Sequence, residues 1–162
     1  MDPVNIQVIV LDVDGVLTDG RVTLGEHGDV GKRFNVRDGF AIKRWQAAGR
    51  RTAILSGRYS HEVALRAKEL GIEVVRQNAG DKAEGLREVL RALDLSADCV
   101  AYMGDDVPDE AAMGRCHLRV TVADAASSLK RAAHFVTRRR GGEGAVAEFI
   151  EWLMRKQGRW SS

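Results

Sequence analysis

The chain has 162 residues, of which 44% are hydrophobic and 30% are charged. Size and composition of this kind are typical of one globular domain with a buried core, so we expect 1–162 to be a single domain. The formal net charge of +2 gives no reason to expect nucleic acid or an anionic membrane as a partner. No apolar run approaches the ~20 residues that cross a bilayer, and no signal peptide is visible, so we expect a cytoplasmic protein.

The cysteines and the basic runs agree with this expectation. Cys99 and Cys116 are too few for a disulfide framework, and free thiols in a reducing compartment are the expected state. The basic runs at 130–131 and 138–140 are short and local. They favour a solvated or anion-facing edge over a nucleic-acid surface.

Strand-like and helix-like segments alternate along the chain. Short apolar or β-branched segments predict strands at 8–13, 51–55, 73–76, 99–103, 118–122 and 134–137. Helical patterns lie between and after them, at 39–48, 60–70, 82–93, 109–115, 127–132 and 143–156. This alternation predicts an α/β fold with a mostly parallel sheet covered by helices on both faces.

One segment, 21–36, breaks the alternation. Two short strand candidates flank a Gly-rich turn, which predicts a β-hairpin inserted after the first strand. The insert is too small to form a separate domain. Because a two-stranded hairpin is unstable alone in water, Val22, Leu24 and Phe34 should pack on the domain itself or on another subunit.

Two carboxylates directly follow the first predicted strand. Asp12 and Asp14 are separated by one residue and are followed by Gly15. With this spacing the two side chains of an extended strand point to the same side. The end of a buried strand is also where α/β proteins place their chemistry. The pair can therefore share a cation, or divide the roles of nucleophile and proton donor.

Three further polar motifs are expected at the same edge of the sheet. They are Ser56-Gly57-Arg58 after the strand at 51–55, Lys82 at the start of a helix, and Gly104-Asp105-Asp106-Val107-Pro108-Asp109 after the strand at 99–103. Each alone also fits an ordinary turn, helix cap or exposed lysine, but all four in this order indicate one site.

The chemical inventory of these motifs favours phosphoryl transfer. Asp12, Asp14 and Asp105 offer the hard oxygen ligands that Mg²⁺ prefers. Lys82 and the Ser56 hydroxyl can stabilise the oxygens of a transferring phosphoryl group. No histidine pair has metal-ligand spacing, and no Walker-type phosphate loop is present.

In this order, Asp12-Val13-Asp14-Gly15-Val16, Ser56, Lys82 and Gly104-Asp105-Asp106…Asp109 resemble the four motifs of the haloacid dehalogenase-like phosphatases. The resemblance spans most of the chain and implies a Rossmann-like three-layer sandwich that uses Mg²⁺. It makes Asp12 the nucleophile that becomes an aspartyl-phosphate. It makes Asp14 the acid that protonates the leaving alkoxide and then the base that activates water.

The same resemblance assigns the remaining motif residues. Ser56 and Lys82 bind the phosphoryl group. Asp105 ligates Mg²⁺ together with the Asp12 carboxylate and the Asp14 main-chain carbonyl. Asp106 and Asp109 are orienting or outer-sphere residues.

Four longer segments, 14–20, 34–40, 104–109 and 141–146, are similar to the family of 3-deoxy-D-manno-octulosonate 8-phosphate phosphatases. Members of that family act in lipopolysaccharide precursor synthesis. The resemblance implies a small enzyme without a large cap domain. Its inserted hairpin and its C-terminal tail and helix, here about 138–162, complete the active site within a homotetramer. The substrate implied is a small sugar-acid phosphate.

One departure from the family pattern leaves the substrate open. The family tail continues Gly-Ala-Val-Arg-Glu, whereas this chain has Ala147 in place of the arginine. A phosphatase of a sialic-acid-type 9-phosphate is therefore the alternative, and Arg138, Arg139 or Arg140 could replace the missing charge.

The candidate substrate-binding residues are Gly57, Arg58 and Arg66. Of the two arginines, Arg58 has the better claim to a substrate carboxylate, because it directly follows the Ser56-Gly57 turn. A non-catalytic interaction module is a third hypothesis. It is disfavoured because every expected catalytic position is occupied.

Overall fold

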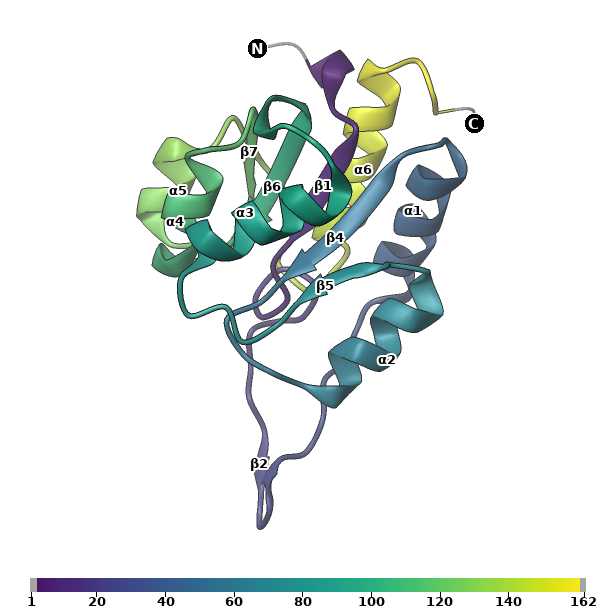
Figure 1. Ribbon diagram of the computed structural model, residues 1–162. Coiled ribbons are helices and arrows are strands. Elements are labelled where there is room, and N and C mark those ends of the chain that lie inside the picture. The colour runs from purple at the N-terminus through teal and green to yellow at the C-terminus, as the bar shows by residue number, and fades with distance from the viewer. Residues whose placement is uncertain (1–2, 161–162) are drawn as a thin grey trace.

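The computed structural model describes residues 3–160 and is built around a six-stranded sheet in the order β5-β4-β1-β6-β7-β8 (Figure 1). All neighbouring strands in this sheet are parallel, which confirms the predicted α/β architecture. The strands are β1 (Val8–Leu11), β4 (Arg51–Leu55), β5 (Val74–Arg76), β6 (Val100–Gly104), β7 (Leu118–Thr121) and β8 (Phe135–Val136).

Helices cover both faces of the sheet, as the alternating pattern predicts. One face carries α1 (Val36–Ala47), α2 (His61–Leu70) and α6 (Ala145–Lys156), and the other carries α3 (Lys82–Leu93), α4 (Glu110–Met113) and α5 (Ser127–Ala132). Side chains alternate along each strand, so Ile9 of β1 enters the first core with Trp45, and Val10 enters the second with Leu86. The result is a three-layer sandwich.

Several element boundaries differ from the predicted ones for local reasons. The first strand ends at Leu11 rather than at residue 13, because the backbone turns so that the amides of Val16 and Leu17 both donate to the Val13 carbonyl. The predicted helix 109–115 is divided into a 3-10 turn, η3 (Val107–Asp109), and the short α4. Two other 3-10 turns are η1 (Pro3–Asn5) and η2 (Ala97–Cys99).

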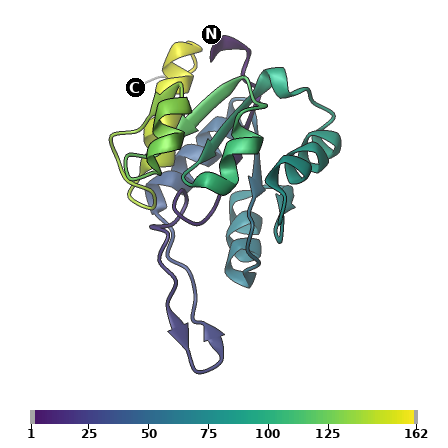
Figure 2. The same ribbon diagram turned by 90° about the vertical axis from the view of Figure 1, so that its left-hand side faces the viewer.

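A narrow arm, residues 21–33, projects from the body of the domain (Figures 1 and 2). It carries an antiparallel pair of two-residue strands, β2 (Leu24–Gly25) and β3 (Gly28–Asp29). The predicted limit at residue 36 was too long, because Asn35 caps α1 by accepting a hydrogen bond from the Arg37 amide at 2.8 Å. Leu24 is 74% exposed, whereas Phe34 packs on the core.

The last helix is capped by a residue of another helix. Gly144 is the N-cap of α6 and provides no side chain, but Asp38 of α1 accepts a hydrogen bond from the Ala147 amide at 2.9 Å. The Asp38 side chain is buried, and burial raises its pKa to about 6. The hydrogen bond from Ala147 and the nearby Arg139 only partly oppose this rise. Asp38 therefore joins α1 to α6. Its burial costs more free energy when the carboxyl group is ionised than when it is protonated.

The segment before α6 packs behind the loop that follows β1. The Gly142 amide donates to the Val16 carbonyl at 3.0 Å, and a Cβ atom on Gly141 would lie 1.7 Å from the Gly15 carbonyl oxygen. Only glycine fits at that distance. The Gly-rich tail thus supports the Asp14–Gly15 loop of its own chain. None of the helices within residues 3–160 has both the length and the apolar character needed to cross a bilayer.

Replacing Asp38 with Asn should make folding stability less dependent on pH. The folded carboxyl keeps its proton up to a pKa of about 6, whereas an unfolded aspartate releases it near about 3.9. The wild-type contribution is therefore most favourable below the lower value and is lost as the pH rises to the upper one, a change of roughly 2 to 3 kcal/mol.

Asp38→Asn retains an acceptor oxygen for Ala147 and has no proton to lose. Urea unfolding of both proteins at about pH 4, 5, 6 and 7 measures the effect, and the variant should gain stability relative to wild type across this series. A difference that stays constant with pH would mean that the Asp38 carboxyl has the same pKa in the folded and the unfolded protein.

Candidate active site

Three carboxylates meet at the carboxyl edge of the sheet. Asp12 follows β1, Asp105 follows β6, and Asp109 ends η3. One oxygen atom from each lies within 4.8 Å of the others. The first and fourth sequence motifs are therefore brought together as expected, because β1 and β6 are neighbours in the parallel sheet.

The single lysine at the start of α3 is buried against this cluster. The Lys82 ammonium lies 2.9 Å from Asp12 Oδ2 and 2.6 Å from Asp109 Oδ1. The helix begins here because the side chain of Asp81 accepts hydrogen bonds from the Ala83 and Glu84 amides. Burial opposes the charge of Lys82, but the two carboxylates outweigh it and raise the pKa of the ammonium group.

The cluster holds more negative charge than Lys82 can balance. Burial and the neighbouring Asp109 raise the pKa of Asp12 well above its usual value, although Lys82 opposes the rise. The same two causes raise the pKa of Asp105 to about 7. Closely spaced, buried carboxylates that resist ionisation are a suitable oxygen donor set for a divalent cation, which would favour their charged forms.

Asp109 organises the loop that carries the other acids. Its carboxylate is buried and accepts hydrogen bonds from the Tyr102 hydroxyl at 2.7 Å and from the Asp105 and Asp106 amides at 3.0 and 3.2 Å. Its partner Asp106 caps η3 through the Val107 amide at 2.8 Å. The structure thus gives both residues contacts that shape the loop, as an orienting role requires.

Asp14 lies at the mouth of the site, where its side chain is 23% exposed. Its Oδ1 atom is 2.6 Å from the ammonium of Lys32, which comes from the arm. The next residue, Gly15, has φ +86°, and a Cβ there would lie 1.9 Å from Asp105 Oδ2. A glycine is required for the first and fourth motif loops to approach this closely.

The Ser56 motif lies beside the cluster at the end of β4. Ser56 is buried, and its main chain is tied to the Arg76 carbonyl and the Ala79 amide at 2.8 and 3.0 Å. A Cβ on Gly57 would be 3.9 Å from Lys82 Cε, so this turn lies against the lysine stem. All four predicted motifs therefore converge on one edge.

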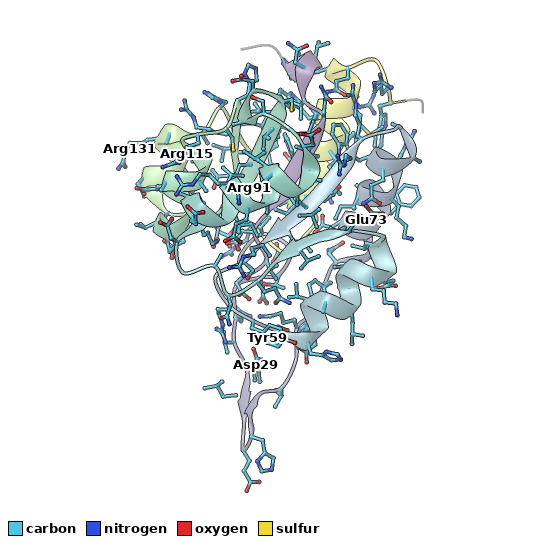
Figure 3. All side chains as sticks on the ribbon, viewed as in Figure 1. Asp29, Tyr59, Glu73, Arg91, Arg115 and Arg131 are labelled. Carbon is cyan, nitrogen blue, oxygen red and sulfur yellow. The ribbon has the colours of Figure 1, made fainter. Side chains whose placement is uncertain are left out.

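The two candidate substrate arginines occupy different surroundings. Arg58 is half exposed, with Nη2 3.6 Å from Asp29 Oδ2 of the arm. Figure 3 shows Asp29 on the part of the arm that lies near Tyr59. Arg66 instead reaches Glu69 at 2.8 Å and the Asn35 carbonyl at 3.4 Å. The structure therefore places Arg58 beside the arm residue Asp29, whereas Arg66 contacts Glu69 of its own helix and the residue that caps α1.

Sequence reasoning missed Lys32 and Tyr102. Lys32 stands in a Gly-rich, charged segment, where a lysine is usually solvated. Tyr102 lies within an apolar strand, where an aromatic residue is expected in the core, and only the position of Asp109 reveals the use of its hydroxyl. Neither residue had a distinguishing local signal.

Comparison with known proteins agrees with this geometry. The family model of the haloacid dehalogenase-like hydrolases matches residues 60–150, a range that contains Lys82 and the Gly104–Asp109 motif. The 3-deoxy-D-manno-octulosonate 8-phosphate phosphatase of Yersinia pestis is 40% identical over 153 residues, which are 94% of this chain and 82% of that protein.

Solved structures of similar proteins have the same fold. The cobalt-bound form of the deoxy-D-mannose-octulosonate 8-phosphate phosphatase from Haemophilus influenzae superposes with a TM-score of 0.95 at 35% identity, covering 98% of this chain and 92% of that one. The 3-deoxy-D-manno-octulosonate 8-phosphate phosphatase of Moraxella catarrhalis, in complex with magnesium, phosphate and KDO, gives 0.92 at 33% identity, covering 96% and 90%.

The resemblance inferred from the motifs is thereby confirmed over nearly the whole length of the chain. The chain belongs to the haloacid dehalogenase-like hydrolases and, within them, to the family of the 3-deoxy-D-manno-octulosonate 8-phosphate phosphatases.

Proposed function

We propose that this phosphatase is a Mg²⁺-dependent enzyme that hydrolyses 3-deoxy-D-manno-octulosonate 8-phosphate to the free sugar acid and phosphate, in lipopolysaccharide precursor synthesis. The observation that carries the proposal is the group of buried Asp12, Asp109 and Lys82 and partly buried Asp105 at the sheet edge. The relatives named for this substrate, and the related complex with magnesium, phosphate and KDO, support it.

The residues present fit a magnesium ion. Asp12 and Asp105 would hold it together with the main-chain carbonyl of Asp14, while Asp109 stays bound to Lys82 and Tyr102. When bound, the ion neutralises part of the negative charge of the phosphate ester. Without it, the substrate would approach several carboxylates opposed by one lysine.

The side chains act in two successive displacement steps at phosphorus. Asp12 attacks phosphorus, and the bond between phosphorus and the sugar oxygen breaks as Asp14 gives a proton to that oxygen. Asp14 then takes a proton from water, which attacks the aspartyl-phosphate and releases phosphate. Lys82 and Ser56 stabilise the phosphoryl oxygens in both steps. The Val13 amide, at 2.7 Å from Asp12 Oδ1, helps fix the nucleophile.

The substrate carboxylate would meet Arg58 beyond the Ser56-Gly57 turn. Arg58 is half exposed beside the arm, and the Gly57 turn that precedes it lies against the stem of Lys82. Arg66 would act from farther away, since its guanidinium contacts Glu69 and Asn35.

One observation favours a sialic-acid-type 9-phosphate as a second candidate substrate. Position 147 lacks the arginine of the family tail, and Ala147 presents only its methyl group in the first turn of α6.

We further propose a cytoplasmic homotetramer in which neighbouring subunits complete each site. Both cysteines are free thiols, as a reducing compartment keeps them. Three apolar side chains of the arm are exposed to different degrees, Val22 at 39%, Leu24 at 74% and Val30 at 62%. Burying them between subunits would stabilise an arm that has only two short strands.

Phosphate release from two sugar-acid phosphates tests the function directly. With Mg²⁺, we expect kcat/KM to be higher for 3-deoxy-D-manno-octulosonate 8-phosphate than for N-acetylneuraminate 9-phosphate, and chelator should abolish both activities. The opposite preference would retain the chemistry and overturn the substrate.

The variant Asp12→Asn tests the chemical step. It keeps the size of the side chain and an acceptor oxygen but removes the nucleophile, so activity should fall by at least about a thousandfold. Full Mg²⁺-dependent activity in this variant would rule out the aspartyl-phosphate mechanism.

Mg²⁺ affinity should increase as the pH rises towards about 7, because Asp105 has a pKa of about 7 without a cation and must lose its proton to become a ligand. Calorimetric titration at pH 6 and pH 8, in buffers of different ionisation enthalpy, measures the affinity and the protons released. Asp105→Asn should weaken binding strongly, whereas Asp98→Asn, an exposed change before β6, should not. An affinity independent of pH would contradict the expectation.

Light scattering tests the assembly. We expect a mass near four times 17.8 kDa, and Leu24→Asp should lower it by placing a charge in the buried contact. Leu65→Asp is the control, since Leu65 is a half-exposed leucine of α2 outside the arm. A stable wild-type monomer would contradict the tetramer.

A further inference from the structure

Lys32 is a buried cation in an otherwise exposed arm. Its side chain is only 4% exposed, and its ammonium lies 2.6 Å from Asp14 Oδ1. Its neighbour Arg33 is exposed and takes part in none of the ion pairs among residues 3–160. Burying an ammonium group is costly unless it is paired, so the contact with Asp14 is what stabilises Lys32 in this position.

The base of the arm is held over the site by further contacts. Asp29 Oδ2 lies 3.9 Å from the Lys32 ammonium and 3.6 Å from Arg58 Nη2. Gly31 faces Glu62 at the start of α2, where a Cβ on the glycine would be 3.9 Å from the carboxylate. The alternating charges of Asp14, Lys32, Asp29 and Arg58 connect the candidate proton donor to the candidate substrate-binding arginine.

The chemistry of an ammonium group decides what this contact does to Asp14. An ammonium group only donates hydrogen bonds, and an unprotonated carboxyl oxygen accepts from it more strongly than a protonated one does, so the contact disfavours a proton on the oxygen that it holds. Lys32 holds Oδ1. The acid form of Asp14 is therefore more stable with its proton on Oδ2, to which no residue among 3–160 donates a hydrogen bond.

We propose that Lys32 is a positioning residue for Asp14: it fixes the rotation of the carboxyl group and favours its transferable proton on Oδ2. This inference rests on the proposed function, in which Asp14 protonates the leaving group. In that step a bond forms between Asp12 and phosphorus, the bond from phosphorus to the leaving oxygen breaks, and the Oδ2 proton moves to that oxygen. Asp14 is left as a carboxylate, still held at Oδ1.

A series of substituted phenyl phosphates tests the role without involving sugar recognition. Its kcat/KM covers the steps up to departure of the phenol, and the need for a proton donor grows as the phenol becomes less acidic. Lys32→Met should therefore lower kcat/KM for phenyl phosphate by about tenfold or more, and for 4-nitrophenyl phosphate by less than about threefold.

Two further variants test whether the loss comes from the Lys32 ammonium group itself. Lys32→Arg restores a donor-only cation and should recover part of the loss for phenyl phosphate. Arg33→Met removes the neighbouring exposed cation and should leave the whole series unchanged. An equal loss for all the phenyl phosphates would indicate a structural role and overturn the proposal. A loss confined to KM for the sugar phosphate would indicate a substrate contact and overturn it equally.

A second measurement does not depend on turnover. In the ¹⁵N spectrum of lysine ammonium groups, Lys32 should give a slowly exchanging signal that is absent in Lys32→Met and shifted in Asp14→Asn. Absence of that signal in the wild-type protein would overturn the proposal even if the enzyme is active. Its presence in a protein that hydrolyses no sugar phosphate would leave the ion pair intact and reject only the proposed substrate.

Discussion

The structure depends on a local excess of negative charge that is held in place by the parallel sheet. Asp12, Asp105 and Asp109 approach within 4.8 Å because two adjacent strands end at the same edge, and Lys82 supplies a buried positive charge in direct contact with Asp12 and Asp109. Isolated charges of this kind would be expensive to bury. Here they are compensated by the Val13 amide, the Tyr102 hydroxyl and the loop amides around Asp109. The protein can therefore fold with these groups close together. The remaining excess of negative charge still favours binding of a cation.

The order of strands and helices could be predicted because each element has its own periodicity. Buried strands are short apolar segments, and helices are bounded by recognisable signals, such as Gly71 in the left-handed conformation at the end of α2. The start of α1 was placed three residues late, although Asn35 is a good N-cap residue and marks the true start. The four motifs were predicted to converge because strand ends in a parallel sheet share one edge.

The remaining features depend on contacts between segments far apart in the chain. The arm has exposed residues on both strands, so no pattern of burial could indicate its direction. Lys32 is buried only because Asp14 lies opposite it, 18 positions earlier. Asp38 is buried only because α6 begins beside it, 109 positions later. Arg66 is a candidate substrate ligand by its charge alone, and its contact with Glu69 could not be read from the sequence. Local composition contains none of this information.

The glycines behind the first loop also link distant parts of the chain. Gly142 binds the Val16 carbonyl and Gly141 lies against Gly15, so the loop carrying Asp14 rests on a segment contributed more than a hundred positions later. A shortened protein ending before this segment would retain the four phosphatase motifs between Asp12 and Asp109. It would lose the support beneath the first loop. Newly made chains would therefore acquire a fully ordered nucleophile loop only after the final helix has been synthesised and docked.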